Sequence, residues 1–270
     1  MMNRIDAIIE NRENNGDQLI ESRCNIEFKD VSFRYVKQES VLQNVSFDIN
    51  SNEVVMIIGE SGSGKSTILD LITGLLRPSS GSILYDGLES QSVNFEKFRE
   101  NISYVGQDVT IQDATILENI ALGTDGVISK DLINDIKAIL SKVRLQAFES
   151  ETEDGVYYEV GENGSNLSGG QVQRLLLARA IFRKPSILIL DEATSSLDTK
   201  TDKQINEVLK DIKGQSTIIL VTHKLNNLDL ADKVVFLKGG KLCEVGSLEK
   251  LLSNQGEFQK FYEIHESQKS

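Results

Sequence analysis

The chain has 270 residues, 29 basic and 41 acidic side chains, a net charge of −12 and an apolar content of 39%. This length is enough to bury a sizeable core in one large domain or two small ones. The acidic balance argues against a general attraction to nucleic acid or to an anionic membrane. Any anion therefore has to be held by a local site.

The sequence predicts no membrane-spanning helix and no secretory leader. The longest uninterrupted apolar run is Val54–Ile58, whereas a spanning helix needs about 20 apolar residues. The N-terminus lacks the apolar core of a secretory signal. We expect the chain itself to be soluble and to remain in the cytosol. Cys24 and Cys243 match no metal or redox spacing and are predicted to be ordinary thiols.

The first half of the chain begins with a polar, acidic segment, residues 1–22, whose apolar stripe consists of Ile5, Ile8 and Ile9. This segment is predicted to be a connector that docks on something else. Residues 26–33 and 41–49 then alternate between apolar and polar side chains, which is typical of antiparallel strands with one face in water.

Three later runs, Val54–Ile58, Ile187–Leu190 and Thr217–Val221, are almost entirely apolar. Such runs are typical of parallel strands buried on both faces, with helices between them. Ligands of these sheets gather beyond the carboxyl ends of the strands. Between residues 108 and 170 the strand pattern gives way to a helical apolar face, so a helical insertion is predicted within an α/β core.

Residues 59–67 read Gly-Glu-Ser-Gly-Ser-Gly-Lys-Ser-Thr and follow the first apolar run directly. The spacing matches the phosphate-binding loop, in which glycines let backbone N–H groups wrap an anion. The next segment, 66–76, has helical apolar spacing and is expected to stop before Pro78. The helix N-terminus would face the phosphate. The predicted nucleotide-binding residues of this loop are Gly59, Ser61, Gly62, Ser63, Gly64, Lys65, Ser66 and Thr67.

Two acidic residues follow the run Ile187–Leu190. In phosphate-loop enzymes an acid at this position holds Mg²⁺ together with the loop hydroxyl, so Asp191 and Ser66 are the predicted metal ligands. Glu192 can polarise the attacking water. His223 ends another buried run at the same edge of the sheet, which favours a role in the site over a structural one.

A second glycine turn, Leu-Ser-Gly-Gly-Gln at residues 167–171, precedes a helical run. Ser168 is a natural N-cap, and the glycines expose backbone N–H groups at the helix start, which makes a second candidate anion site. One chain does not need two sites for one terminal phosphate. The second site is therefore expected to act on a nucleotide held by another molecule.

With these stretches in view, residues 23–265 resemble the nucleotide-binding domain of an ATP-binding cassette (ABC) transporter. The Leu-Ser-Gly-Gly-Gln turn is identical to the signature motif of that family, and the other motifs occur in the family's order. The resemblance assigns Tyr35, which follows a strand expected at a sheet edge, to adenine stacking. It assigns Gln107 to the Q-loop, as a catalytic residue and metal ligand, and His223 to the switch histidine. Further nucleotide contacts implied by the signature and by the D-loop are Ser168, Gly169, Gly170, Gln171 and Asp198.

The resemblance also implies a domain organisation: a connector at 1–22, an α/β core at 23–107 and 172–265, a helical subdomain at 108–171, and a tail at 266–270. The fold expected is that of a P-loop NTPase, with a mostly parallel sheet and an antiparallel β flank. Residues 115–123 and 159–164 are similar to the segments of exporters rather than importers. The connector resembles the one that follows the last transmembrane helix of an exporter.

The implied activity is ATP hydrolysis with Mg²⁺, coupled to transport. Two copies would dimerise head to tail, with each ATP between Lys65 and Ser66 of one copy and Ser168 and Gly170 of the other. The implied partners are an identical nucleotide-binding domain and the transmembrane domain of an exporter, on the same polypeptide or a separate subunit, at the cytoplasmic face of the membrane. The catalytic residues implied are Lys65, Gln107, Glu192 and His223.

Two other interpretations remain. The first is a soluble cassette ATPase that acts on nucleic acid or ribosomes. Such proteins usually carry coiled coils, a second cassette or basic patches, whereas this acidic single cassette has none of these features, so no nucleic acid partner is expected. The second is a nucleotide-operated binding module without catalysis, against which Glu192 and His223 argue.

Overall fold

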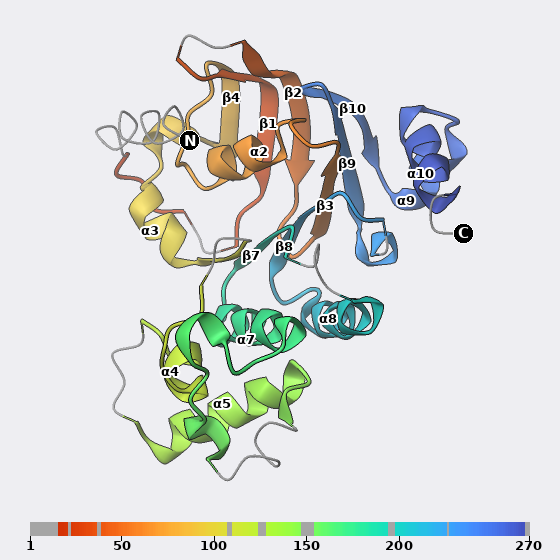
Figure 1. Ribbon diagram of the computed structural model, residues 1–270. Helices are drawn as coiled ribbons and strands as arrows, with labels where there is room; N and C mark the ends of the chain where they lie inside the picture. The colour runs from red at the N-terminus through yellow and green to blue at the C-terminus, as the bar shows by residue number, and fades with distance from the viewer. Residues whose placement is uncertain are drawn as a thin grey trace.

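The computed structural model of the chain describes residues 16–20, 23–36, 39–106, 110–123, 128–146, 154–193, 198–225 and 227–267. Two β-sheets lie close together with helices between and beneath them. The helices α4 (Ile116–Ile120) and α5 (Lys130–Lys142) stand apart at one end (Figure 1). The segments 1–15, 107–109 and 194–197, which include most of the predicted connector, the predicted metal ligand Gln107 and most of the D-loop, fall outside the described residues.

The larger sheet has six strands in the order β10-β9-β3-β8-β7-β6. Its strands are β3 (Val54–Gly59), β6 (Ile102–Val105), β7 (Ile187–Asp191), β8 (Thr217–Thr222), β9 (Lys233–Lys238) and β10 (Lys241–Gly246). Every neighbouring pair is parallel except β9 and β10. The three apolar runs predicted to be buried parallel strands are β3, β7 and β8, so that prediction is confirmed.

The smaller sheet is antiparallel and has the order β2-β1-β4-β5. Its strands are β1 (Ile26–Arg34), β2 (Ser40–Ile49), β4 (Ser80–Tyr85) and β5 (Leu88–Glu89). The predicted antiparallel flank is therefore present. The expectation that Tyr35 follows an edge strand is wrong, because β1, which ends just before Tyr35, lies between β2 and β4 in this sheet.

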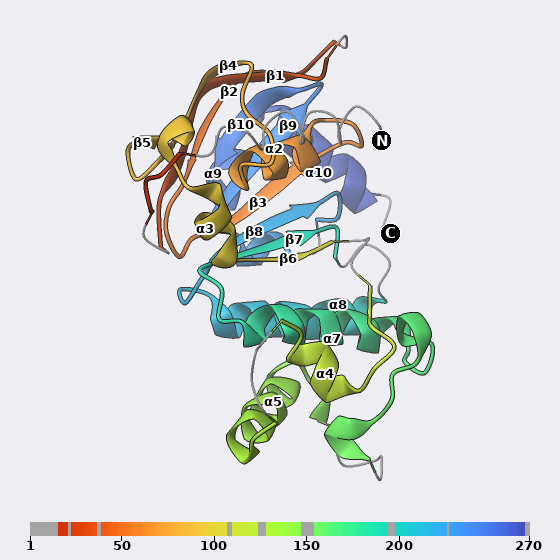
Figure 2. The same cartoon turned by 90° about the vertical axis from the view of Figure 1, so that its left-hand side faces the viewer.

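Successive residues of the central strands point to opposite faces of the larger sheet, as the period of two requires. Val55, Ile57, Ile189 and Ile219 pack in one core with helix α2 (Lys65–Ile72) and the antiparallel sheet. Their neighbours along the strands pack in a second core with helices α7 (Gly169–Phe182) and α8 (Thr199–Ile212). Figure 2 shows α2 on one side of β3, β8 and β7, with α7 and α8 on the other side. The sheet thus separates two apolar layers.

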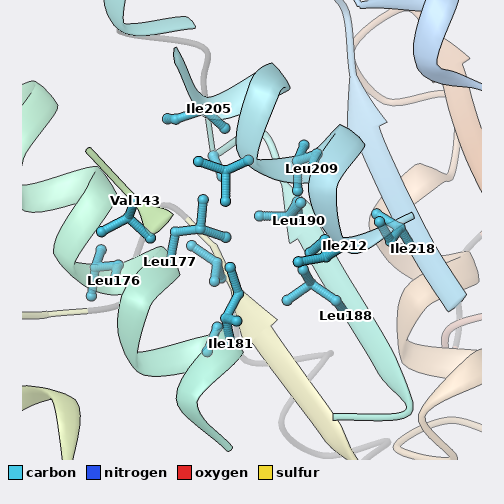
Figure 3. Close-up of a cluster of buried hydrophobic side chains, with 14 of the residues drawn as sticks. Val143, Leu176, Leu177, Ile181, Leu188, Leu190, Ile205, Leu209, Ile212 and Ile218 are labelled. Atoms are coloured by element: carbon cyan, nitrogen blue, oxygen red, sulfur yellow. The ribbon is translucent and has the colours of Figure 1, made fainter. Parts of the chain in front are cut away.

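The second core is built mainly by long aliphatic side chains (Figure 3). Leu188 and Leu190 of β7 meet Leu177 and Ile181 of α7 and Leu209 of α8. All five are at least nine-tenths buried. Burial of each such side chain stabilises the fold by about 1.5–3 kcal/mol. This layer fixes the position of α7, the helix that follows the signature turn, against β7, the strand that ends at the acidic residues.

The helices around the sheets are of moderate length. They are α2 (Lys65–Ile72), α3 (Phe95–Glu100), α4 (Ile116–Ile120), α5 (Lys130–Lys142), α7 (Gly169–Phe182), α8 (Thr199–Ile212), α9 (Leu248–Ser253) and α10 (Glu257–Ser267). Short 3₁₀ helices span Ser90–Ser92, Gly155–Tyr157, Glu162–Gly164 and Leu228–Leu230. The helix predicted over 66–76 ends earlier, at Ile72. It ends there because Gly74 adopts φ +68°, and its α-carbon lies against the ring of Phe95.

The predicted helical insertion is seen as α4, α5 and the 3₁₀ turns before α7. The apolar face of α5 is turned inward as expected, with Ile136 and Leu140 fully buried. Thr115 forms an antiparallel bridge with Glu159, which ties the start of α4 to the segment before the signature. Helix α7 continues through residues 171 and 172, where the subdomain boundary was placed, so that boundary stays a prediction.

Three smaller expectations concern the chain ends, the thiols and the membrane. Gln18 pairs with Val93, so the last described part of the predicted connector lies against the region before α3. Burial raises the pKa of the Cys24 thiol to about 12, which fits an unreactive structural thiol. Among the described residues, none of the helices combines the length and the apolar character that crossing a bilayer would demand.

Candidate nucleotide-binding site

The loop between β3 and α2 depends on its glycines. Gly62 and Gly64 adopt φ values of +78° and +99°, in the left-handed region that glycine alone enters without strain. At Gly64 a Cβ would also come within 2.5 Å of the Leu42 side chain. Both the backbone conformation and this close contact therefore favour glycine here. The loop therefore brings its backbone close to whatever it encloses.

Helix α2 begins at Lys65 with its first N–H groups directed at the loop. Its N-cap, Gly64, supplies no side-chain acceptor, so a bound anion can meet these donors and the positive end of the helix dipole. The Ser63 hydroxyl is buried and has no hydrogen-bond partner among the described residues. A loop that offers this buried hydroxyl and the N–H groups of a helix N-terminus fits a phosphate. Ser61 and Ser66 are exposed beside it, and Thr67 is buried.

Lys65 lies across this loop, and its ammonium donates hydrogen bonds to the carbonyl oxygens of Gly59 at 2.9 Å and Glu60 at 2.8 Å. Burial lowers the pKa of Lys65, and the charges of Glu192 and Asp191 act in the opposite direction. The two acidic residues are therefore within electrostatic range of the loop lysine. This proximity was expected from the sequence, because β7 and β3 end at the same edge of the sheet.

Asp191 is the last residue of β7, and Glu192 follows it. The Glu192 backbone has φ +53° and its N–H donates to the carbonyl of Val221 at 2.8 Å. A left-handed conformation costs a side-chain-bearing residue roughly 1–3 kcal/mol and is found most often at functional positions. The Glu192 carboxylate faces His223, with 3.5 Å between Oε1 and Nδ1. The structure thus brings together three of the predicted site residues at the ends of β7 and β8.

Tyr104 was not among the predicted site residues, yet it contacts one of them. Its hydroxyl donates a hydrogen bond of 2.7 Å to Oδ2 of Asp191. Tyr104 pairs with Ile189 across β6 and β7, so its side chain is on the same face as Ile189 and Asp191. The sequence holds a weak signal for this contact, because a polar-ended aromatic directly precedes the predicted Q-loop.

The second glycine turn forms the N-terminus of α7. Ser168 and Gln171 form a reciprocal capping box: Gln171 N–H donates to Ser168 Oγ at 3.3 Å, and Ser168 N–H donates to Gln171 Oε1 at 2.7 Å. Gly169 is exposed, with open space where a Cβ would stand. At Gly170 a Cβ would lie 2.8 Å from Oγ1 of Thr201, so Gly170 permits the close approach of α7 and α8.

The two glycine turns open helices on opposite faces of the larger sheet. Helix α2 belongs to the core shared with the antiparallel sheet, and α7 belongs to the other core (Figure 2). Neither Ser168 nor Gln171 has a hydrogen bond to the loop at 59–64 among the described residues. This arrangement fits the expectation that the two turns serve different nucleotides.

Two other predicted contact residues have local partners in the chain. Asp198 caps α8, with Oδ1 accepting from the N–H groups of Lys200 and Thr201 and Oδ2 accepting from the Thr201 hydroxyl at 2.7 Å. These hydrogen bonds lower the pKa of the Asp198 carboxyl. Tyr35 is half-buried and packs edge-to-face on Phe33, with ring centroids 4.9 Å apart. Their roles toward a nucleotide stay predictions.

No group of three or more His, Cys, Asp or Glu side chains forms a ready metal site in the described part of the chain. The predicted ligands Ser66 and Asp191 offer a hydroxyl and a carboxylate, which are the hard oxygen ligands that Mg²⁺ prefers. Phosphate-loop sites bind Mg²⁺ through one or two such groups together with the phosphates of the substrate. The donor set present therefore fits this metal.

Two features define a P-loop nucleotide-binding domain. One is the glycine loop between a buried parallel strand and an uncapped helix, and the other is the acidic end of a neighbouring strand. The sequence profile of the family described as "ABC transporter" matches residues 42–195, more than half of the chain. The chain belongs to the ABC transporter family. The sequence-based identification of this family and of its α/β fold is confirmed.

Individual relatives extend the match to nearly the whole chain. An uncharacterized ABC transporter ATP-binding protein of Sinorhizobium fredii is 37% identical over 252 residues, 93% of this chain and 42% of the relative. The ATP-dependent lipid A-core flippase of Francisella novicida is 36% identical over 91% of this chain and 41% of its own length. The structure of a bacterial Atm1-family ABC exporter with ATP bound superposes with a TM-score of 0.82 at 33% identity, covering 93% of this chain and 43% of that one.

The chain thus spans about two-fifths of the length of the curated relatives it matches.

Proposed function

We propose that this chain is the ATP-binding and ATP-hydrolysing domain of an ABC exporter. The observation that carries the proposal is the convergence of Lys65, Asp191, Glu192 and His223 at one edge of the sheet, beside a glycine loop shaped for phosphate. The relatives named as a flippase and as an exporter with ATP bound support it.

Within this proposal the loop residues 59–67 hold the phosphates, and Tyr35 stacks on the adenine. Ser66, Asp191 and Gln107 would hold Mg²⁺, which when bound would neutralise phosphate charge. Lys65 leaves the carbonyl oxygens of Gly59 and Glu60 to bind the terminal phosphates.

The hydrolytic step uses two neighbouring side chains. Glu192 orients a water and accepts its proton as the water attacks the terminal phosphate. His223, 3.5 Å from that carboxylate, is placed to stabilise the charge that develops on the phosphate. Water and ATP yield ADP and phosphate, and the proton leaves through the carboxylate.

The second glycine turn completes the site from another copy of the chain. Because α2 and α7 open on opposite faces of the sheet, Ser168 and Gly170 are available to a nucleotide held by a partner. A head-to-tail homodimer with ATP would then have two intact sites. Hydrolysis would release the two copies from one another.

The proposed membrane partner is the transmembrane domain of an exporter, on the same polypeptide or on a separate subunit, with this domain at the cytoplasmic face of the membrane. The chain's coverage of only 42% of a curated relative fits a domain of a larger assembly. The residues 115–123 and 159–164, joined by the Thr115–Glu159 bridge, are the proposed contact region.

A phosphate-release assay tests the proposal. The chain is incubated with ATP and Mg²⁺, and Lys65→Ala serves as the inactive control. We expect metal-dependent phosphate release by the wild-type chain and none above background by the variant. Stimulation by a lipid-embedded transmembrane domain would support the exporter assignment, whereas stimulation by DNA, RNA or ribosomes would favour the soluble cassette ATPase. ATP binding without release would favour the binding module.

A further inference from the structure

The end of β6 carries a side chain that reaches the predicted metal ligand. Ser103 and Val105 point toward α7: the Ser103 hydroxyl donates to the Ala180 carbonyl at 2.9 Å, and Val105 lies in the α7 core. Tyr104, between them, must point to the opposite face of the sheet, the face on which α2 and the phosphate loop lie. Strand pairing of Tyr104 with Ile189 brings its ring alongside Asp191, two residues further on.

The contact is a well-formed hydrogen bond to a charged acceptor. The distance from the Tyr104 hydroxyl to Asp191 Oδ2 is 2.7 Å, within the range of strong O–H···O⁻ bonds. Gly106 packs against the tyrosine, since a Cβ there would lie 2.6 Å from Cε1 of the ring. The ring is therefore held in place on one side by the backbone just after β6, although Tyr104 is 41% exposed.

Resting on the proposed function, we infer that Tyr104 is a positioning residue for the metal carboxylate of Asp191. A carboxylate with one oxygen fixed by a phenol loses rotational freedom, so its orientation toward the metal is set before the metal arrives. Partners of this kind, which hold a metal ligand without touching the metal, typically contribute 10–100-fold to metal affinity. Because this phenol is partly exposed, a smaller effect is expected here.

The position of Tyr104 gives this bond a second consequence. Tyr104 lies three residues before Gln107, at the carboxyl end of β6. A displacement of that strand end would move the phenol and thereby loosen the Asp191 carboxylate. The hydrogen bond thus links the segment that leads into the predicted Q-loop with the metal ligand on β7.

The test measures nucleotide binding rather than turnover. The affinity of a fluorescent, non-hydrolysable ATP analogue is determined in EDTA and in Mg²⁺, and the ratio gives the gain in affinity due to the metal. In Tyr104→Phe we expect this gain to fall roughly 3–10-fold relative to wild type, scaled down from the usual effect of such partners. The affinity in EDTA should stay within about twofold, because the phenol does not contact the phosphates.

Two control variants calibrate the measurement. Asp191→Asn should abolish the metal-dependent gain. Tyr157→Phe should leave it unchanged, because Tyr157 is a half-exposed tyrosine on the short 3₁₀ helix Gly155–Tyr157. A gain in Tyr104→Phe within twofold of wild type, or an equal loss of affinity with and without metal, would overturn the positioning role while leaving ATP binding intact. Absence of nucleotide binding by the wild-type chain would instead overturn the proposed function and this inference with it.

Discussion

Glu192 combines a strained backbone with a chemically useful position. Its φ of +53° is maintained because its N–H is bonded to Val221 on the neighbouring strand, and this turn directs the carboxylate toward His223. A residue such as glycine would adopt this backbone more easily. The presence of glutamate indicates that the carboxylate, rather than the turn, is what the position requires.

Replacing that carboxylate by its amide isolates its chemical role. We expect Glu192→Gln to keep ATP affinity, because the shape is unchanged and Glu192 is not assigned to phosphate binding. Turnover should fall about 10²-fold or more, the scale for losing a positioned base. Phosphate release and equilibrium nucleotide binding are measured side by side, with Glu249→Gln on α9 as a matched control. Near-normal hydrolysis in Glu192→Gln would defeat the assignment.

His223 is expected to act in the same step through its contact with Glu192. His223→Ala should slow hydrolysis more than it weakens ATP binding, because the side chain is half exposed and faces Glu192. The comparison of the turnover rate with nucleotide affinity distinguishes this outcome from general damage. Parallel loss of both quantities, with a lower melting temperature, would indicate misfolding.

At the residue scale, the loop lysine and the acidic pair could be identified from the sequence because they belong to contiguous motifs. It could not supply the Tyr104–Asp191 hydrogen bond, since that contact depends on the register of β6 against β7. Nor could it show that Asp198 uses both carboxylate oxygens to cap α8. Side-chain contacts across strands or at helix starts depend on pairings that a single sequence leaves open.

At the scale of elements, the guanidinium of Arg179 is one of the links between α7 and the helical insertion. Arg179 of α7 donates to the Thr110 carbonyl at 3.0 Å, the Asn119 carbonyl at 2.8 Å and Oδ1 of Asn119 at 2.6 Å. Asn119 is itself fully buried and donates to the carbonyl of Gln112. Burial lowers the pKa of Arg179, but a guanidinium keeps its charge in proteins. Its Nε, Nη1 and Nη2 atoms each donate one of these hydrogen bonds.

We expect Arg179→Ala to lower the free energy of unfolding by about 2–4 kcal/mol, because the Asn119 side chain and two carbonyl groups lose their donor in a largely buried region. Urea unfolding followed by circular dichroism measures the change. Arg183→Ala, an exposed arginine just after α7, is the control and should shift stability by less than about 0.5 kcal/mol. Equal effects of the two substitutions would show that the guanidinium contacts do not stabilise the fold.

The start of α4 predicts a pH dependence. Glu118 accepts hydrogen bonds from the Thr115 N–H and from the Thr115 hydroxyl, both at 2.9 Å, and these bonds lower the pKa of its carboxyl. A carboxyl with a depressed folded-state pKa stabilises the fold fully above its unfolded pKa and loses this contribution as pH falls through the folded value.

We therefore expect Glu118→Gln to have a lower melting temperature than wild type at pH 7, with the difference shrinking below about pH 4 as the wild-type carboxyl becomes protonated. Glutamine can still complete the capping box, so the helix itself should form. Thermal unfolding at several pH values is the measurement. A melting-temperature difference that does not change with pH would contradict the charge-based explanation.

Element types were predictable where a periodic pattern extended over a whole element. The strands β3, β7 and β8 and the inward face of α5 follow from runs of apolar residues alone. The end of α2 was less predictable: the pattern continues to Leu76, but Gly74 with φ +68° ends the helix at Ile72 to accommodate the ring of Phe95. That ring comes from α3, and tertiary packing of this kind overrides local periodicity.

At the scale of the whole molecule, the larger sheet decides how the two glycine turns can be used. The strands alternate their side chains between two cores, one with α2 and the other with α7 and α8. The loop that ends at Lys65 and the turn that begins at Ser168 therefore open helices on opposite faces. In a pair of chains, the turn at Ser168 of each chain can contact the nucleotide held by the loop of the other, so that both the loop and the turn bind a nucleotide.

This arrangement predicts complementation between two inactive variants. Lys65→Ala removes the loop lysine and leaves the signature turn intact. Gly169→Asp places a negative charge at the turn where a phosphate would approach, and the fold should tolerate it because the position is open and an acid is favourable in the first turn of a helix. Each variant alone should be inactive, since both sites of its dimer carry the same defect.

A mixed dimer contains one doubly defective site and one site in which the intact loop of one chain meets the intact turn of the other. Half of the dimers in an equimolar mixture are mixed, so we expect recovery of up to about a quarter of wild-type phosphate release if the sites act independently. Gly169→Ala, which adds no charge, is the control and should retain activity by itself. If mixing restores nothing while both variants still bind or dimerise as folded proteins, the loop and the turn do not complete one another across two chains.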